Sequence, residues 1–324
     1  MKRLLGKIVL YGFLMALVLE ALVRIFHLYF QYPVVTLGQN DVVNYIPGQE
    51  GYFVTGNRRM NFAHYRINGS GFNSYHEFRP TQQGFEIALI GDSFIEGLHQ
   101  NYDNSIGRKI ENRLSNKVEV FEYGFSGYDL ADELHLIHQL KSDMDRIDLI
   151  FIYLKFEDDI KRNTYTVHTR ANLENSMSFK IKREVKLLSY LKGIGLLAPL
   201  TDLPNRLKGI MGKENQVSSE KERDLGSRDQ EYLDNLGTLL ETFPIDREKS
   251  VFLINRSITS ALFIQYCDSL GYKYVDFGKP LENSTENTLI KYDPMKHWND
   301  HGRDIVAKVI SDYVDAHALK VPLQ

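Results

Sequence analysis

A serine and a histidine that lie far apart in the chain are of the types that nucleophilic catalysis requires. Ser93 follows the apolar run IALIG at 87–91, where a strand would end and a helix begin. A hydroxyl at such a turn is exposed and lies near backbone N–H groups, which can stabilise an oxyanion. His297 offers an imidazole that can accept the serine proton. The alternatives are a helix-capping role for Ser93 and a surface aromatic pair between His297 and Trp298.

Four polar segments follow strand-like runs or lie in comparable late loops. They are GDSF (91–94), EYGFSGY (122–128), KFEDDIKRN (155–163) and YDPMKHWNDHG (292–302). In a parallel sheet, ligands bind beyond the carboxyl ends of the strands, so we expect these segments to meet there. Gly127, in the second segment, would let the backbone approach a ligand closely.

The elements that must position these residues alternate between strands and helices. Apolar runs of strand length lie at 85–90, 118–123, 148–154, 250–255 and 272–277. Helical spacing of apolar residues lies between them and after them, at 106–114, 130–140, 258–271 and 303–316. This alternation predicts an α/β fold with a doubly wound parallel sheet.

The chain divides into an N-terminal segment (1–30), a lead-in segment (31–80) that lacks sustained periodicity, and a main domain (81–318). The strand–helix pattern breaks over 161–249, which we interpret as an insertion. Its apolar part around 187–211 predicts a packed helical cap, with a lid over the site or a surface lying on the membrane as alternatives. The polar run that follows, 213–230, predicts a mobile loop.

The N-terminal segment has the pattern of a membrane anchor. MKRLLGK is basic, and the next 23 residues, 8–30, are almost wholly apolar, enough for a helix to cross a hydrocarbon core of ~30 Å. Glu20 and Arg24 interrupt the run four residues apart and can pair on one helical face. The basic flank predicts a cytoplasmic N-terminus and an exported remainder. A cleavable signal peptide and a buried core helix are the alternatives.

The composition argues against other classes of protein. The net charge of −3 is unlike the basic excess of nucleic-acid binders. Cys267 is the only cysteine, so no intrachain disulfide can form. No His/Cys cluster has the spacing of metal ligands.

Several motifs together give the chain a family resemblance. GDSF resembles the first block of the SGNH/GDSL hydrolases, EYGFSGY resembles the second, and HWNDHG (297–302) resembles the HWNxxG form of the last. RINGSGF (66–72) resembles a segment of the membrane-anchored bacterial members that are linked to extracellular polysaccharides. The resemblance covers about residues 60–318 and includes the anchor.

The resemblance implies a three-layer α/β/α sandwich and acyl-ester hydrolysis or transfer without a metal or an organic cofactor. It makes Ser93 the nucleophile and His297 the general base. The backbone N–H groups of Ser93 and Gly127 become oxyanion donors.

Two positions depart from the family pattern. Asp158 stands where the family has an asparagine whose side chain donates to the oxyanion, and an ionised carboxylate cannot donate. A protonated Asp158 would need a strongly raised pKa, and Lys155 or Asn163 are the alternative donors. The family's acid lies two or three residues before the histidine, whereas here Asp293 lies four before it. Either the loop adjusts so that Asp293 reaches His297, or the pair acts without an acid.

These expectations describe a single-pass inner-membrane protein with a periplasmic or otherwise extracytoplasmic serine esterase domain. Its substrate would be an acylated carbohydrate of the cell envelope or an exported glycan, with acetyl as the favoured acyl group. Polysaccharide-assembly proteins are possible partners, and nucleic acid is not expected. Two alternatives stay open: an O-acyltransferase using the same residues, and a catalytically inactive glycan-binding or assembly protein.

Overall fold

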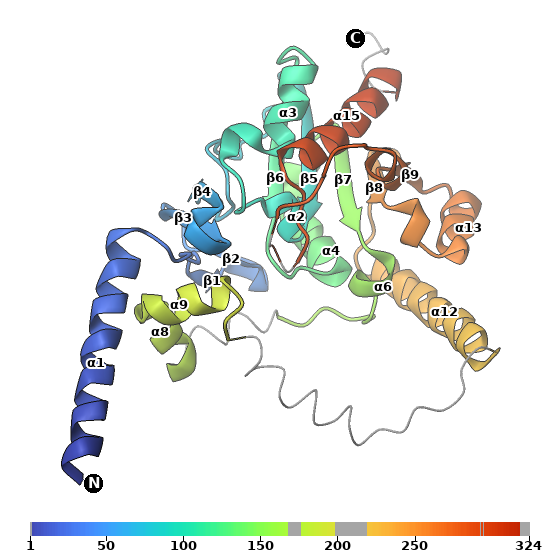
Figure 1. Cartoon of the computed structure of the whole chain (residues 1–324). Coiled ribbons are helices and arrows are strands. Elements are labelled where there is room, and N and C mark those ends of the chain that lie inside the picture. The colour runs from blue at the N-terminus through green and yellow to red at the C-terminus, as the bar shows by residue number, and fades with distance from the viewer. Residues whose placement is uncertain (1, 168–175, 198–218, 292, 294, 318–324) are drawn as a thin grey trace.

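The structure, a computed structural model, describes residues 2–167, 176–197, 219–291, 293 and 295–317 (Figure 1). Its centre is a five-stranded parallel sheet in the order β6-β5-β7-β8-β9. The strands are β5 (Phe85–Gly91), β6 (Val118–Gly124), β7 (Leu149–Leu154), β8 (Ser250–Ile254) and β9 (Lys273–Asp276). All six residues of β7 are buried, as expected for a strand covered on both faces.

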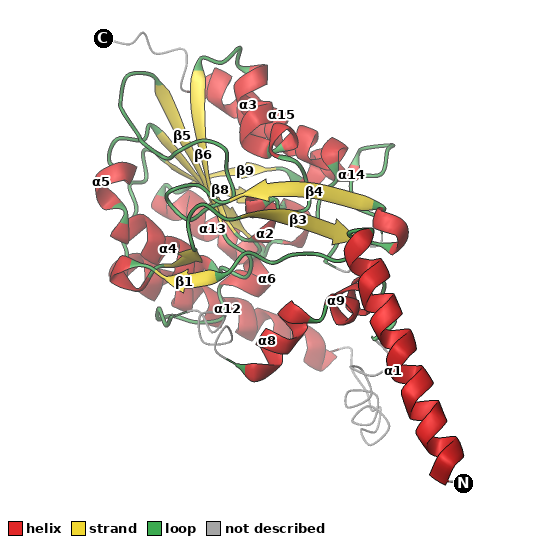
Figure 2. Ribbon diagram, turned by 90° about the vertical axis from the view of Figure 1, so that its left-hand side faces the viewer, coloured by secondary structure: helices red, strands yellow, loops and turns green. Residues whose placement is uncertain are grey.

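Helices cover both faces of this sheet (Figure 2). One layer contains α3 (Ile106–Arg113), α14 (Gly278–Glu282) and α15 (Asp300–His317), and the other contains α4 (Leu130–Gln139), α12 (Ser219–Thr242) and α13 (Ala261–Leu270). Side chains of β5 alternate between two apolar cores: Ile87 faces the α3–α15 layer, and Ile90 faces the α4–α12 layer. The predicted three-layer sandwich is therefore confirmed.

The strand order places a topological switch point at β5. The chain passes from β5 to its neighbour β6 and then returns to β7 on the other side of β5. Ligands of doubly wound sheets bind at such a point, beyond the carboxyl ends of the strands. Gly91 at the end of β5 is in register with Gly124 at the end of β6, so the loops that follow both strands start side by side.

The lead-in segment is more regular than its sequence predicts. It forms two antiparallel pairs, β1 (Val35–Leu37) with β2 (Val43–Tyr45) and β3 (Glu50–Thr55) with β4 (Asn61–Arg66). Aromatic side chains lie on both faces of the second pair, which hides the alternation that marks a strand. Several buried members, Tyr45, Phe53 and Tyr65 among them, belong to the α4–α12 core, so this segment is part of the main body.

Short helices complete the description. They are α2 (Ser93–Glu96), α5 (Lys141–Met144), α6 (Phe156–Asp159) and four 3-10 turns, η1 (Gln39–Asp41), η2 (Asn57–Arg59), η3 (Tyr102–Asn104) and η4 (Arg256–Ile258). Asp129 begins α4 with a reciprocal capping box in which Asp132 is the partner.

The segment 161–249 contains three described helices, α8 (Met177–Glu184), α9 (Lys186–Gly193) and α12. The prediction of a mobile loop over 213–230 is wrong from Ser219 onward, where α12 begins. The first turns of α12 are polar and therefore resemble a loop in sequence. The part of the helix that belongs to the apolar core lies downstream, at Leu233, Leu236 and Leu239. The predicted helical cap around 187–211 lies partly outside the described residues.

Helix α1 (Lys2–Ile25) projects from the body (Figures 1 and 2). Its 24 residues correspond to ~36 Å, and it is long and apolar enough to cross a membrane. Val23 is its one buried side chain among those described. The expected pair forms, with Arg24 Nε 2.7 Å from Glu20 Oε1. Glu20 also accepts the backbone N–H groups of Lys186 and Leu187, which fastens the start of α9 to α1.

Candidate active site

Ser93, His297 and Asp293 form one chain of hydrogen bonds. His297 Nε2 lies 2.8 Å from Ser93 Oγ, and His297 Nδ1 lies 2.5 Å from Asp293 Oδ2. With the Nδ1 proton donated to the carboxylate, Nε2 is free of a proton and accepts the hydrogen bond of the Ser93 hydroxyl. His297 is only 3 % exposed, so the imidazole is screened from water. This is the arrangement of a nucleophile, a base and an orienting acid.

The loop before His297 adjusts so that Asp293 can reach it. Lys296 has φ of +56°, a left-handed conformation that is uncommon outside glycine and turns the chain back. The Asp293 carboxylate also accepts the backbone N–H groups of Met295 and His297, at 3.1 and 2.9 Å. Burial alone would raise the pKa of Asp293, but these hydrogen bonds and the His297 side chain lower it to about 2. Asp293 is therefore ionised at neutral pH.

Ser93 is placed by the turn between β5 and α2. Asp92 caps α2 by accepting the N–H of Phe94 at 2.8 Å, and its other oxygen accepts Lys155 Nζ at 2.5 Å. Burial opposes the charge on Lys155, but the carboxylates of Asp92 and Asp159 raise its pKa. Asp92 thus braces the turn, and Lys155 ties it to the end of β7.

The loop after β6 carries Gly127 at φ of +92°, a conformation that favours glycine. The neighbouring Ser126 is held by Glu96 of α2, which accepts the Ser126 backbone N–H at 3.0 Å and its hydroxyl. Tyr45 of the lead-in segment donates to the same carboxylate at 2.5 Å. The buried Glu96 therefore fixes the distance between the Ser93 turn and the Gly127 loop.

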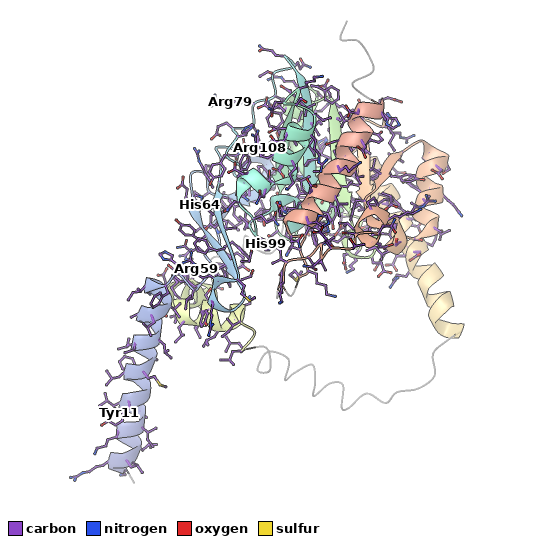
Figure 3. The ribbon with its side chains drawn as sticks, turned by 45° about the horizontal axis from the view of Figure 1, so that its top comes forward. Tyr11, Arg59, His64, Arg79, His99 and Arg108 are labelled. Atoms are coloured by element: carbon purple, nitrogen blue, oxygen red, sulfur yellow. The ribbon has the colours of Figure 1, made fainter. Side chains whose placement is uncertain are left out.

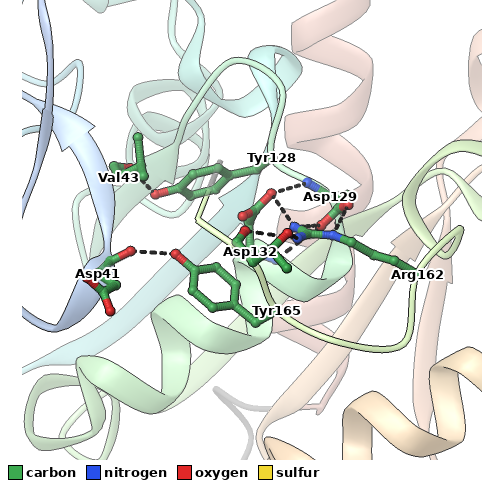
Figure 4. Close-up of polar contacts among 8 residues, drawn as sticks. Asp41, Val43, Tyr128, Asp129, Asp132, Arg162 and Tyr165 are labelled. Atoms are coloured by element: carbon green, nitrogen blue, oxygen red, sulfur yellow. Dashed lines mark hydrogen bonds and ion pairs between the residues drawn. The ribbon is translucent and has the colours of Figure 1, made fainter. Parts of the chain in front are cut away.

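A second network holds the other end of that loop (Figure 4). Arg162 binds Asp129 with two nitrogens, each at 2.7 Å, and also lies 2.9 Å from Asp132. The Tyr128 hydroxyl donates to the carbonyl of Val43 in β2. Tyr165 makes the same kind of bond to the carbonyl of Asp41. The chain that follows Gly127 is thus tied both to the lead-in segment and to the segment after β7.

A cavity of about 420 Å³ opens over the serine. Its lining includes Ser93, Gly127, Asp293 and His297, so four of the five residues singled out from the sequence meet at one place. Aromatic and apolar side chains form much of the remaining wall: Phe30, Tyr32, Phe53, Val54, Phe179 and Met295.

Asp158, the fifth residue, does not line this cavity. Its carboxyl is 64 % exposed and accepts a hydrogen bond from Lys161 at 2.9 Å, which lowers its pKa. A protonated Asp158 that donates to an oxyanion is therefore the wrong interpretation. The two alternative donors, Lys155 and Asn163, do not line the cavity. Lys155 binds Asp92 instead, and Asn163 is exposed to solvent. Of the oxyanion donors expected from the sequence, the backbone N–H groups of Ser93 and Gly127 belong to residues that line the cavity.

Comparison with known proteins gives distant structural matches. A scan against protein-family models finds no match, and no curated protein matches the chain. A member of the lipolytic protein G-D-S-L family from Veillonella parvula is 12% identical, with a TM-score of 0.39, over 74% of this chain and 100% of that one. A lipase/acylhydrolase from Enterococcus faecalis is 11% identical, with a TM-score of 0.38, over 72% of this chain and 96% of that one.

A carbohydrate acetylesterase family member from Sinorhizobium meliloti is 13% identical, with a TM-score of 0.35, over 72% of this chain and 98% of that one. At such identities and TM-scores, these matches say nothing about what this chain acts on.

His99 is a site residue that the sequence did not reveal (labelled in Figure 3). Its ring stacks on that of His297 with centroids 3.7 Å apart, and it is only 4 % exposed. Its Nδ1 is buried without a hydrogen-bond partner among the described residues. Burial, and then the neighbouring His297, hold the pKa of His99 well below its usual range. Nothing in the local sequence marks His99, because its role depends on a segment at the other end of the chain.

His99, Asp293 and His297 also bring one possible metal ligand atom each to within 4.8 Å of one another. The two imidazoles stack face to face, so their in-plane lone pairs converge poorly on a single ion. Asp293 and His297 are moreover bonded to each other. The geometry suits proton transfer better than metal binding.

The other polar residues of the last motif have structural contacts. Asn299 donates to the carbonyls of Asn287 and Leu289 and accepts the N–H of Gly302, so it organises its own loop. His301 Nε2 lies 2.9 Å from the Ser284 hydroxyl, and His301 does not line the cavity.

Proposed function

We propose that the protein is a serine hydrolase that cleaves carboxylic esters through an acyl-enzyme. The observation that carries this proposal is the hydrogen-bonded chain Ser93–His297–Asp293, which opens on a cavity also lined by Gly127. Such a chain is the arrangement that activates a serine hydroxyl.

In the first half of the reaction, Ser93 Oγ attacks the ester carbonyl carbon while His297 Nε2 takes the hydroxyl proton. The carbonyl oxygen becomes an oxyanion next to the backbone N–H groups of Ser93 and Gly127. The bond to the alcohol then breaks, and the alcohol leaves with the proton from His297. Water, deprotonated by the same nitrogen, releases the acid and restores the Ser93 hydroxyl.

We further propose O-acyl groups of a cell-envelope or exported glycan as the substrate. The aromatic wall of the cavity, with Phe30, Tyr32, Phe53 and Phe179, supports this choice, because apolar faces of sugar rings can pack on aromatic rings. The apolar helix α1 supports a location at the inner membrane with the catalytic domain outside the cytoplasm.

One observation favours a second candidate, a catalytically inactive protein that binds glycan or an assembly partner. Asp158 is exposed and ionised and does not line the cavity, so it does not supply the side-chain donor that the family's asparagine provides. Loss of one oxyanion donor typically costs on the order of 10²–10³ in rate, which slows an enzyme without abolishing its chemistry. Hydrolysis therefore remains the main proposal. Transfer of the acyl group to a sugar would use the same residues.

The test is fluorophosphonate labelling of the full chain in detergent. We expect labelling of the wild type and of the control Ser257→Ala, which removes an exposed serine of η4. Ser93→Ala and His297→Ala should lose the label, because one removes the nucleophile and the other removes its base. Labelling that persists in Ser93→Ala would contradict the proposal. Acetate release from acetylated glycans, with and without acceptor sugars, then separates hydrolysis from transfer.

A further inference from the structure

A second cavity adjoins the one over Ser93. It has a volume of about 470 Å³ and lies between α8, α9, strand β3 and the segment that follows α1. Four residues line both cavities: Phe30, Tyr32, Phe179 and Lys192. The two cavities are therefore adjacent at these side chains, and a ligand that passes between them reaches from the serine into the second cavity.

The second cavity lies where the apolar helix ends. Phe30, Gln31 and Tyr32 in its wall come only a few residues after Ile25, the last residue of α1. Helix α9 forms another wall and is fastened to α1 by Glu20. With α1 across a bilayer, the second cavity lies at the membrane surface, a region in which aromatic residues such as Tyr32 are enriched.

The lining of the second cavity is amphipathic. Leu188, Leu197 and the aromatic residues supply apolar wall, while Arg183, Lys186 and Lys192 supply three positive charges against the two carboxylates of Glu50 and Glu184. Basic side chains at a membrane surface attract anionic head groups. Lys192 occupies the junction of the two cavities, between an apolar space and the serine.

We propose that the second cavity holds the aliphatic chain of a membrane-borne anionic amphiphile, whose phosphate lies at Lys192 and whose ester-bearing saccharide reaches Ser93. The substrate is thus a saccharide joined through phosphate to a bilayer chain, and not a free polysaccharide. This inference rests on the proposed function for the identity of the reacting group and on α1 for the membrane.

Burial of the aliphatic chain explains why the second cavity lies next to the membrane. The aliphatic chain moves from the apolar bilayer into an apolar cavity, so its transfer costs little hydrophobic free energy. The enzyme thereby meets a substrate that is confined to the bilayer surface. The saccharide, which is polar, stays in the cavity over Ser93. The phosphate between them meets a cation at the junction.

The test uses the full chain in phosphatidylcholine nanodiscs and a photoreactive probe, monododecyl phosphate with a diazirine at the chain end. After irradiation, mass spectrometry maps the labelled peptides. We expect label on α9, and loss of that label in Ser189→Trp, which fills the cavity from a buried position on α9. Leu188→Trp is the second blocking variant if Ser189→Trp does not fold. Leu270→Trp, an exposed position on α13, is the matched control and should keep the label.

Charge is tested separately with Lys192→Gln. A lysine beside an anionic lipid surface contributes about fivefold in binding, and we take the same factor for Lys192 beside one phosphate group. We therefore expect the phosphate probe to label α9 about fivefold less in Lys192→Gln. The same probe built on dodecanol should label wild type and variant alike. Equal labelling by the phosphate probe would contradict the placement of the phosphate.

Label confined to α1 and to lipid-facing residues would show partition into the bilayer only and would overturn the proposal. So would undiminished label on α9 in the folded blocking variants. Because the readout needs no reaction at Ser93, Ser93→Ala should be labelled like the wild type. A protein that takes the probe on α9 but is not labelled by fluorophosphonate would refute the proposed hydrolysis and leave the amphiphile site standing.

Discussion

The hydrogen bond from His297 to Asp293 decides which imidazole nitrogen faces the serine. Asp293 accepts the Nδ1 proton at 2.5 Å, so Nε2 is the nitrogen available to Ser93. The carboxylate is held in turn by two backbone N–H groups of its own loop. Burial raises the pKa of Asp293, but the His297 side chain and these hydrogen bonds lower it to about 2. The carboxylate therefore stays ionised at neutral pH.

Asp293→Asn should therefore impair the reaction more than it impairs folding. The amide can donate to Nδ1 and so stabilise the wrong tautomer, with the proton on Nε2. We expect kcat for an acetate ester to fall by on the order of 10³–10⁴ with little change in KM. Steady-state kinetics check this, with thermal unfolding as the control for folding. An unchanged kcat would mean that Ser93 and His297 act as a pair.

His99 should influence the reaction through its stacked ring. His297 becomes cationic when it takes the serine proton, and the neutral His99 stacks on it without adding a second charge. An aromatic stack is worth ~0.5–1.5 kcal/mol, which corresponds to about 2–12-fold in rate. We expect His99→Ala to lose activity in this range and His99→Phe, which keeps an aromatic ring, to recover most of it. If both variants lose activity equally, the stack is not the cause.

At the scale of elements, the ends of β5 and β7 are joined by charged groups. Lys155, directly after β7, binds Asp92 at the start of α2, and Asp159 at the end of α6 accepts the Lys155 backbone N–H at 2.7 Å. Burial raises the pKa of Asp159 to about 8, although Lys155 opposes the rise. The folded protein therefore holds a proton on Asp159 at neutral pH that the unfolded chain releases.

This proton makes stability depend on pH in a defined direction. Between the unfolded pKa of Asp159, near 3.8, and its folded pKa of about 8, the folded state binds more protons, so the free energy of unfolding falls as pH rises. Asp159→Asn removes this dependence because the amide resembles the protonated carboxyl. We expect the Tm of the wild type to fall further between pH 5 and pH 8 than that of Asp159→Asn, with about 2–4 °C for each kcal/mol. Parallel Tm curves would contradict the raised pKa.

At the scale of the whole molecule, the lead-in segment and α9 join the apolar helix to the main body. Glu20 of α1 binds the start of α9, and Tyr45 of β2 binds Glu96 beside the serine turn. The candidate anchor is thus connected directly to the site, and residues just after α1, Phe30 and Tyr32, form part of the cavity wall.

The orientation predicted from the basic start of the chain can be measured with a fusion. Alkaline phosphatase folds in an oxidising compartment outside the cytoplasm, so a fusion after residue 40 should be active in a bacterial host. A matched fusion without residues 2–30 should be inactive. An inactive first fusion would contradict export of the catalytic domain.

Much of the fold follows from local patterns. Buried runs such as LIFIYL in β7 and helical spacing such as Ile106 and Ile110 in α3 reflect the layer each element packs against, and this burial is written into the residue types. The antiparallel lead-in pairs and the helix from Ser219 were missed. In those segments, aromatic or polar residues hide the period that neighbouring elements impose.

By itself, the sequence determined the apolar helix, the doubly wound parallel sheet and the identity of Ser93, Gly127 and His297 as candidates. These depend on residue type, periodicity and turn chemistry, which act over short stretches of chain. Only the tertiary structure decided that Asp293 reaches His297, that His99 stacks on it, that Glu96 spans two loops and that Asp158 turns to solvent. Each of these depends on a backbone torsion or on the distance between segments remote in the chain, and no local pattern encodes either.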